Sequence, residues 1–198
     1  SECLVGSEMC IRDRNVLFSK LRPYLNKVVI PDEPGMATTE LVPLRPEPSK
    51  LHKVFLSHLL RGNQFVNYAN DIAGGTKMPR MPLTELRNFD CILPPMDKQL
   101  EFVFIAEQVD KSKFGDFKSQ FIEMFGNPVT NTKGWKTAKI KDVAPEMPSK
   151  EQLSGKIWLL NLDMIESNTG RIIEKVYEDV ENALSCLLYT SPSPRDTR

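Results

Sequence analysis

The chain contains 198 residues with 26 basic and 26 acidic side chains, so its formal net charge is zero. This balance excludes a protein that binds nucleic acid through a general positive field, and any such site must be a local patch. The sequence also contains no run of about 18 apolar residues, which excludes a membrane-spanning helix.

The two ends of the chain are related to each other as DNA. A DNA string that encodes residues 186–196 has a reverse complement which, read two bases in, encodes residues 4–13. An inverted repeat of this kind resembles the adapters used to prepare sequencing libraries. We therefore expect residues 1–14 and 186–198 to be translated adapter, and residues 15–185 to be an internal fragment of a longer protein.

Few residues of this fragment are suited to catalysis or metal binding. Cys91 is its single cysteine, so we expect no disulfide framework, no cysteine-based metal site and a reduced, intracellular setting. His52 and His58 are six residues apart, which is not a ligand spacing, and the acidic pair Asp32 and Glu33 lies in a turn. With no Ser/His/Asp set and no dinucleotide-binding glycine motif, we expect no catalytic residue, no metal and no cofactor.

Residues 16–30 alternate apolar and polar side chains on both sides of Pro23. This pattern predicts a half-buried strand, a break at the proline and a second strand. The polar face carries Lys20, Arg22 and Lys27, which are either solvated strand charges or contacts to phosphates.

A turn at residues 32–35 and an extended segment at residues 37–46 follow these strands. Residues 50–68 then show the apolar periodicity of an amphipathic helix, with Ser49 as a candidate N-cap.

The segment at residues 73–82 is the best candidate for a loop that contacts DNA. Its paired glycines, Gly74 and Gly75, let the backbone approach a partner closely, and two prolines hold the rest extended. Lys77 and Arg80 supply positive charge. The G-x-x-x-x-G-K-[ST] spacing of a phosphate-binding P-loop is absent.

A short strand at residues 89–93 leads to a long helix over residues 98–126. Pro95 and Asp97 are suited to its start and Gly126 to its end, and at about 1.5 Å per residue it would be on the order of 40 Å long. Its apolar stripe consists of Phe102, Ile105, Val109, Phe117, Phe121 and Met124. The stripe fits either a core helix or a strut that joins two domains and pairs with another helix, and the flanking sequence favours the strut.

A second unit follows this helix. Residues 134–143 predict a short strand headed by Trp135, and residues 156–165 predict a strand that runs into a turn, with a hairpin-like return at residues 171–173. We expect Trp135 and Trp158 to be core anchors rather than platforms for base stacking.

Several of these segments resemble, in their order and spacing, the specificity subunits of type I restriction-modification systems. The segments that carry the resemblance are residues 16–25, 74–80, 93–95 with Gln99, 135–143, 161–165 and 169–171.

The resemblance implies an α+β fold: a target-recognition domain with a mixed β-sheet and flanking helices, then a long spacer helix and the start of a second target-recognition domain. Residues 15–97 would be the C-terminal part of the first domain, residues 98–126 a spacer helix that forms a coiled coil, and residues 127–185 the N-terminal part of the second domain.

In this family the specificity subunit recognises double-stranded DNA and directs adenine methylation by modification (methyltransferase) subunits and cleavage by a restriction (translocase and nuclease) subunit. The resemblance therefore implies a DNA-binding, non-enzymatic protein of the bacterial or archaeal cytoplasm. The stripe of the spacer helix would form the subunit interface. The expected DNA-binding residues are Lys20, Arg22, Thr38, Thr39, Gly75, Thr76, Lys77 and Arg80.

Two alternatives stay open. The chain could be a DNA-reading segment of a single-chain restriction-modification enzyme, or a protein-interaction module without DNA binding.

Overall fold

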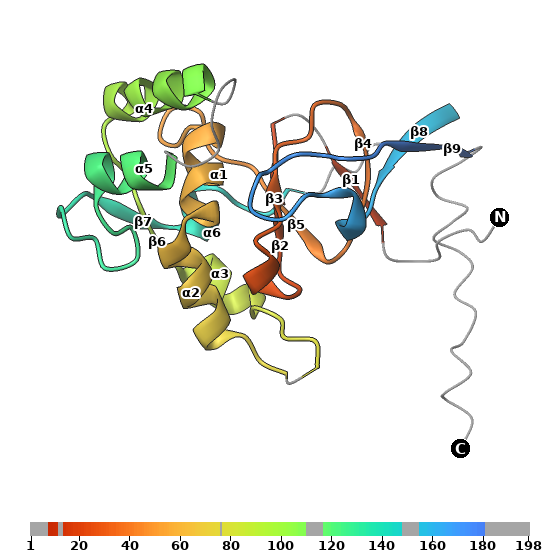
Figure 1. Cartoon of the computed structure of the whole chain (residues 1–198), viewed down its shortest axis with the longest axis horizontal. Coiled ribbons are helices and arrows are strands. Elements are labelled where there is room, and N and C mark those ends of the chain that lie inside the picture. The colour runs from red at the N-terminus through yellow and green to blue at the C-terminus, as the bar shows by residue number, and fades with distance from the viewer. Residues whose placement is uncertain (1–7, 12–13, 76, 110–116, 148–154, 181–198) are drawn as a thin grey trace.

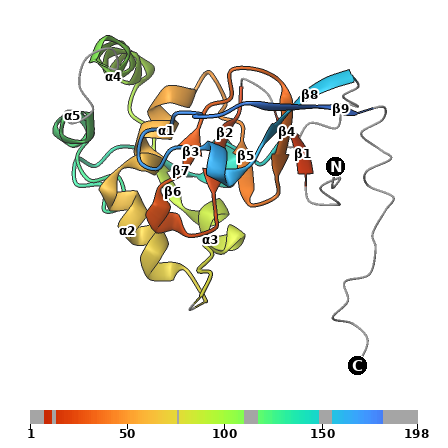
Figure 2. The same ribbon diagram turned by 45° about the vertical axis from the view of Figure 1, so that its right-hand side comes forward.

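A computed structural model describes residues 8–11, 14–75, 77–109, 117–147 and 155–180. The fold is α+β, as the sequence predicts, with helices gathered on one side of the molecule and the largest sheet on the other (Figure 1, Figure 2). No helix among the described residues is long and apolar enough to cross a membrane.

The described strands are β1 (Glu8–Ile11), β2 (Val16–Ser19), β3 (Val28–Val29), β4 (Gly35–Thr38), β5 (Leu41–Leu44), β6 (Asp90–Ile92), β7 (Thr137–Lys139), β8 (Gly155–Leu160) and β9 (Val176–Val180). The described α-helices are α1 (Lys53–Arg61), α2 (Asn63–Ile72), α3 (Leu83–Asn88), α4 (Met96–Val109), α5 (Phe117–Phe125) and α6 (Ile140–Val143). Two 3-10 turns are η1 (Pro23–Leu25) and η2 (Leu162–Met164).

The strands predicted around Pro23 lie at the centre of the fold. β2 pairs antiparallel with β3 and with β5, and η1 separates β2 from β3. Val16 and Phe18 pack in the larger core beneath the helices, whereas Leu17 packs in a smaller core with Trp158. The predicted strand, break and strand are confirmed, but β2 is buried on both faces rather than half-buried.

The helix predicted over residues 50–68 is divided in two. Gly62 has an extended backbone (φ −63°, ψ 145°), so α1 ends before it and α2 begins after it. The N-cap of α1 is His52, not the predicted Ser49. Both helices contribute side chains to the larger core, and the apolar periodicity therefore does not reveal the break.

The prediction of one continuous helix over residues 98–126 is wrong. α4 and α5 are separate helices that contact each other, and residues 110–116 lie outside the described part of the chain. The ring centroids of Phe102 and Phe121 are 5.2 Å apart, whereas a continuous helix would separate these residues by roughly 28 Å. α4 also begins at Met96, which places Asp97 in its first turn rather than at its cap.

Strands from the two sides of α4 and α5 share sheets. β4 pairs parallel with β8, and β6 pairs antiparallel with β7. A Cβ on Gly35 would lie 2.6 Å from the Trp158 carbonyl oxygen, so only glycine allows this approach of β4 and β8. Residues 15–97 and 127–185 are therefore joined where the structure describes them, and their assignment to two recognition domains stays a prediction.

The sheet that contains this pairing has the strand order β1-β4-β8-β9. β1 belongs to the segment that we expect to be adapter-derived, and it pairs antiparallel with β4, with Glu8 opposite Thr38 and Ile11 opposite Gly35. β1 therefore covers the side of β4 that faces away from β8.

Hydrogen bonds tie the segment after β8 to α1 and to the turn between η1 and β3. The Asn26 side-chain amide donates to the Arg61 carbonyl oxygen (2.9 Å) and to Asn168 Oδ1 (3.1 Å). The Arg61 guanidinium in turn donates to the Thr169 carbonyl oxygen. We call Asn26, Arg61, Asn168, Thr169 and Gly170 the Arg61 junction.

Candidate nucleic-acid interface

Three segments that are distant in sequence meet at one place. The Lys20 N–H donates to the Glu40 carbonyl oxygen (3.1 Å), and the Met81 N–H donates to the Lys20 carbonyl oxygen (2.9 Å). The Arg22 N–H donates to the Pro79 carbonyl oxygen (2.7 Å). We call residues 20–22, 38–40, 74–75 and 77–81 the basic site.

The glycine-rich part of the basic site is a closed loop. Gly74 and Arg80 exchange backbone hydrogen bonds of 3.1 and 2.9 Å. Gly75 has a φ of 98°, which favours glycine, and a Cβ there would lie 3.3 Å from the Met78 carbonyl oxygen. Lys77 and Met78 are exposed on this loop, which extends away from the end of α2 (Figure 1). The loop thus presents a cation and an apolar side chain to solvent.

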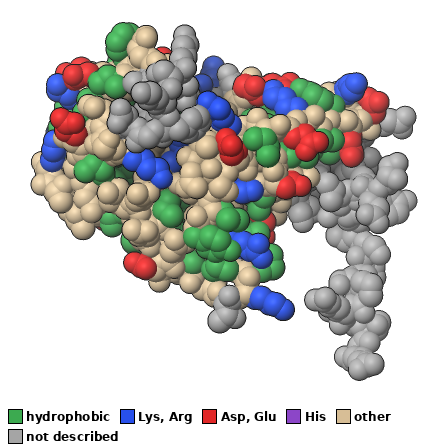
Figure 3. Space-filling model, in the orientation of Figure 1, with side chains coloured by type: hydrophobic (Ala, Val, Ile, Leu, Met, Phe, Trp, Pro, Cys, Tyr) green, Lys and Arg blue, Asp and Glu red, His purple; other side chains and the backbone are tan. Residues whose placement is uncertain are grey.

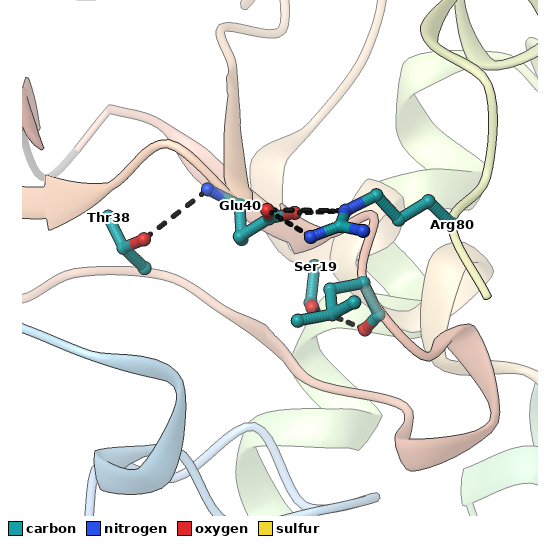
Figure 4. A network of polar contacts seen from close by, with 5 residues as sticks. Ser19, Thr38, Glu40 and Arg80 are labelled. Atoms are coloured by element: carbon teal, nitrogen blue, oxygen red, sulfur yellow. Dashed lines mark hydrogen bonds and ion pairs between the residues drawn. The ribbon is translucent and has the colours of Figure 1, made fainter. Parts of the chain in front are cut away.

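An ion pair links the loop to the turn after β4. The Arg80 guanidinium approaches the Glu40 carboxylate with an Nη2–Oε1 distance of 2.9 Å and Nε distances of 3.3 Å to both oxygens (Figure 4). Hydrogen bonding to Glu40 raises the pKa of the Arg80 guanidinium. The Glu40 N–H lies 3.5 Å from Thr38 Oγ1, which accepts its hydrogen bond. The turn therefore fixes the backbone of Glu40 while its carboxylate faces the loop.

Arg22 has an unused hydrogen-bond donor. Its backbone is left-handed (φ 49°) immediately before η1, and its side chain is half-buried. Within the described residues, Arg22 Nε is buried without a hydrogen-bond partner. Leaving a buried donor unpaired costs about 1–3 kcal/mol, so an anion or water that reached Arg22 would supply the missing acceptor.

The predicted DNA-binding residues come together, with one outside the described chain. The basic site contains Lys20, Arg22, Thr38, Thr39, Gly75, Lys77 and Arg80, whereas Thr76 lies outside the described residues. Lys27, which shares the sequence pattern of Lys20 and Arg22, instead donates to the Leu162 carbonyl oxygen. The DNA-binding roles of these residues stay predictions.

Sequence reasoning missed Glu40. Its carboxylate lies in a Thr-Thr-Glu turn 40 residues from Arg80, and nothing in the local pattern pairs the two. The two residues are brought together by Lys20, whose backbone is hydrogen-bonded both to Glu40 and to Met81, and a local sequence pattern does not contain these distant contacts.

The expected subunit interface is only partly exposed. Phe102 and Phe121 are buried in the core of this chain, and Ile105 and Met124 are half-buried. The side chains of Val109 and Phe117 lie outside the described residues. Phe102 and Phe121 therefore pack within this chain, and the role of the stripe as a subunit interface stays a prediction. The exposed large apolar side chains among the described residues of α4 are Leu100 and Phe104.

A pocket beside the Arg61 junction was not predicted. His58, Arg61, Gln64 and Lys118 contribute to its lining. Burial lowers the pKa of His58 to about 3, and the charge of Arg61 acts in the same direction, so the imidazole is neutral. Lys118 Nζ donates to an asparagine side chain (2.8 Å), and Arg61 donates to a main-chain carbonyl oxygen. Both cations of the pocket are therefore engaged in contacts that hold segments of the chain together.

The described residues contain no group of three or more side chains suited to holding a metal ion. Figure 3 shows acidic and basic side chains interspersed over the visible face, in keeping with a local basic site rather than a general field.

Comparison with known proteins shows a similarity over part of the chain. No protein-family profile matches the chain. Over 94 residues it is 31% identical to the type I restriction enzyme EcoDI specificity subunit of Escherichia coli. The chain is similar to part of a restriction specificity subunit. The match covers 48% of this chain and 20% of the relative, so the chain spans about a fifth of the length of the protein it resembles.

Proposed function

We propose that this chain is part of the specificity subunit of a type I restriction-modification complex and that its basic site contacts double-stranded DNA. Residues 15–97 and 127–185 would be parts of two target-recognition domains of the longer protein. Adenine methylation and DNA cleavage would be carried out by modification and restriction subunits in the cytoplasm, and this chain would position them without catalysing either reaction.

The observation that carries this proposal is that four basic residues lie on adjacent segments of the chain. Lys20, Arg22, Lys77 and Arg80 come from two segments that backbone hydrogen bonds hold together. Contacts between such cations and phosphate oxygens position a protein on a duplex, and an arginine can also bind a guanine edge through two parallel hydrogen bonds. The similarity to a restriction specificity subunit independently supports a DNA-recognition role.

The test is DNA binding as a function of salt. We expect the full chain to bind a mixed-sequence duplex at low salt, and the double variant Lys77→Ala with Arg80→Ala to bind about tenfold more weakly. Each lost phosphate contact lowers the slope of log K against log salt by about 0.9, so the slope should flatten by about one if Lys77 alone contacts a phosphate and by about two if Arg80 does so as well. Fluorescence anisotropy with a labelled duplex gives both quantities.

The matched control removes two cations elsewhere. Lys98 lies on α4, paired with Glu101, and Lys156 lies on β8, both away from the loop in Figure 1. Replacing both by alanine should leave the affinity and the slope close to those of the unchanged chain. An absence of duplex binding at low salt by the unchanged chain and by every variant, Glu40→Gln included, would favour a protein-interaction module. Equal losses in the two double variants would contradict the assignment of DNA binding to the basic site.

A further inference from the structure

Glu40 occupies the edge of Arg80 that an arginine uses to bind DNA. Two neighbouring N–H groups of the guanidinium, Nε and Nη2, face the two carboxylate oxygens at 2.9–3.3 Å (Figure 4). The same edge binds a phosphate or the O6 and N7 atoms of guanine through two parallel hydrogen bonds. Arg80 therefore cannot present this edge to DNA while it is paired with Glu40.

The pair is exposed enough to exchange partners. The side chains of Arg80 and Glu40 retain 47% and 23% of their exposure. Ion pairs at such positions are weakened by solvent and salt. A phosphate that carries a full charge and more than one acceptor oxygen can therefore replace the carboxylate.

Glu40 nevertheless stays at the site after it is displaced. Its carbonyl oxygen accepts the Lys20 N–H, and its own N–H is held by Thr38. Within the three described segments of the basic site, Glu40 is the acidic residue among Lys20, Arg22, Lys77 and Arg80. Its carboxylate thus repels any phosphate that does not gain enough from Arg80 to compensate.

We propose that in the free protein the Glu40 carboxylate occupies the edge of Arg80 that DNA would bind. Glu40 thereby determines specificity, because it weakens binding to non-specific duplexes. This inference rests on the proposed function. DNA that places a phosphate or guanine edge at Arg80 displaces the carboxylate, whereas DNA that does not leaves the ion pair intact.

The chain offers a closely matched control. Arg87 and Glu146 form a second pair with Nε–Oε1 and Nη2–Oε2 distances of 2.6 and 3.3 Å. Their side chains retain 46% and 24% of their exposure, nearly the values of Arg80 and Glu40. This pair joins α3 to the segment after α6 and lies outside the basic site. Removing its carboxylate changes the net charge equally without changing Arg80.

The experiment compares four forms of the full chain with the unchanged protein: Glu40→Gln, Glu146→Gln, Arg80→Ala, and Glu40→Gln combined with Arg80→Ala. The probe is a labelled mixed-sequence duplex titrated at several salt concentrations. We expect Glu40→Gln to tighten binding about threefold to tenfold and to steepen the salt slope by about one, as one added phosphate contact would. Glu146→Gln should leave both quantities unchanged.

The Arg80→Ala background decides whether the effect passes through Arg80. We expect the gain from Glu40→Gln to fall below about twofold there, because Arg80 is no longer present to be released. An undiminished gain in that background would show simple charge repulsion and overturn the inference. Equal affinities for Glu40→Gln and the unchanged chain, or an equal gain from Glu146→Gln, would also overturn it.

The failure of the proposed function has a different signature. If neither the unchanged chain nor any variant binds duplex DNA at low salt, both the function and the inference are wrong. If only Glu40→Gln binds, both are supported, because the carboxylate then masks the site completely. Matching circular dichroism spectra and melting temperatures establish that the variants are folded.

Discussion

The Arg61 junction and the basic site use arginine in opposite ways. The Arg61 guanidinium donates to a main-chain carbonyl oxygen of another segment, beside a crowded glycine and a half-buried histidine. Arg80 is exposed and pairs with a carboxylate that solvent and salt can screen. The first contact holds distant segments of the chain together, and the second can be exchanged for a ligand. Substitutions at the junction should therefore change stability, and substitutions in the basic site should change binding.

The largest effect should come from the ring cluster next to the junction. Phe102 lies 5.1 Å from the His58 ring and 5.2 Å from the Phe121 ring, and it is fully buried. Phe102→Ala should lower the free energy of unfolding by about 3–5 kcal/mol, measured by urea denaturation. Phe104→Ala on the same helix is the control, because that side chain is 65% exposed and should change stability by less than about 0.5 kcal/mol. Similar small losses for both variants would mean that α4 does not pack into the core.

The second-largest loss of stability should come from adding a side chain at Gly170 in the Arg61 junction. Gly170 has a φ of 72°, and an added Cβ would meet the Arg61 guanidinium and, at 3.1 Å, the Val28 carbonyl oxygen. Gly134 has a similar φ of 68° with nothing within 4 Å. We expect Gly170→Ala to cost about 2–3 kcal/mol and Gly134→Ala about 1 kcal/mol, since only backbone strain acts at Gly134. Equal shifts in melting temperature for the two variants would argue against close packing at Gly170.

The smallest of these effects concerns pH. Burial lowers the pKa of His58 from 6.5 to about 3, so the unfolded chain binds a proton more readily than the folded chain between these values. The contribution of His58 to the free energy of unfolding should be fully present above pH 6.5 and should be lost as the pH falls. Between pH 7 and pH 5 this loss should be about 2 kcal/mol. His58→Gln should reduce this dependence in denaturation curves at pH 5 and pH 7.

The control for this dependence is His52→Gln. His52 is half-buried, as His58 is, and burial lowers its pKa too, but only the shift of His58 is large. We expect most of the pH dependence to persist in this variant. A larger reduction from His52→Gln than from His58→Gln would contradict the assignment to His58.

Sequence patterns predicted those parts of the fold that depend on residues close together in the chain. The alternation around Pro23 predicted two strands because Val16, Leu17 and Phe18 of β2 each enter one of two cores. The glycine pair marked a loop that is closed by its own backbone hydrogen bonds. Trp158 is a core anchor, as expected from its type. These features depend on side-chain period and backbone freedom, both of which are visible in sequence.

The errors came from features that depend on distant contacts. The periodicity over residues 98–126 is the same for one long helix and for two helices that bury the same face, so it could not reveal that Phe102 packs against Phe121. The break at Gly62 was hidden in the same way. The pairing of Glu40 with Arg80 depends on the sheet and the loop together, and no local motif encodes it.

The position of β1 has a practical consequence for handling this protein. β1 pairs along the outer side of β4, and it is contributed by the segment that we expect to derive from an adapter. A shortened version that starts at residue 15 would leave the N–H and C=O groups of β4 open to another polypeptide, which is the usual route to edge-to-edge aggregation. Poor solubility of such a version would therefore indicate an uncovered sheet edge rather than a failure of the rest of the chain to fold.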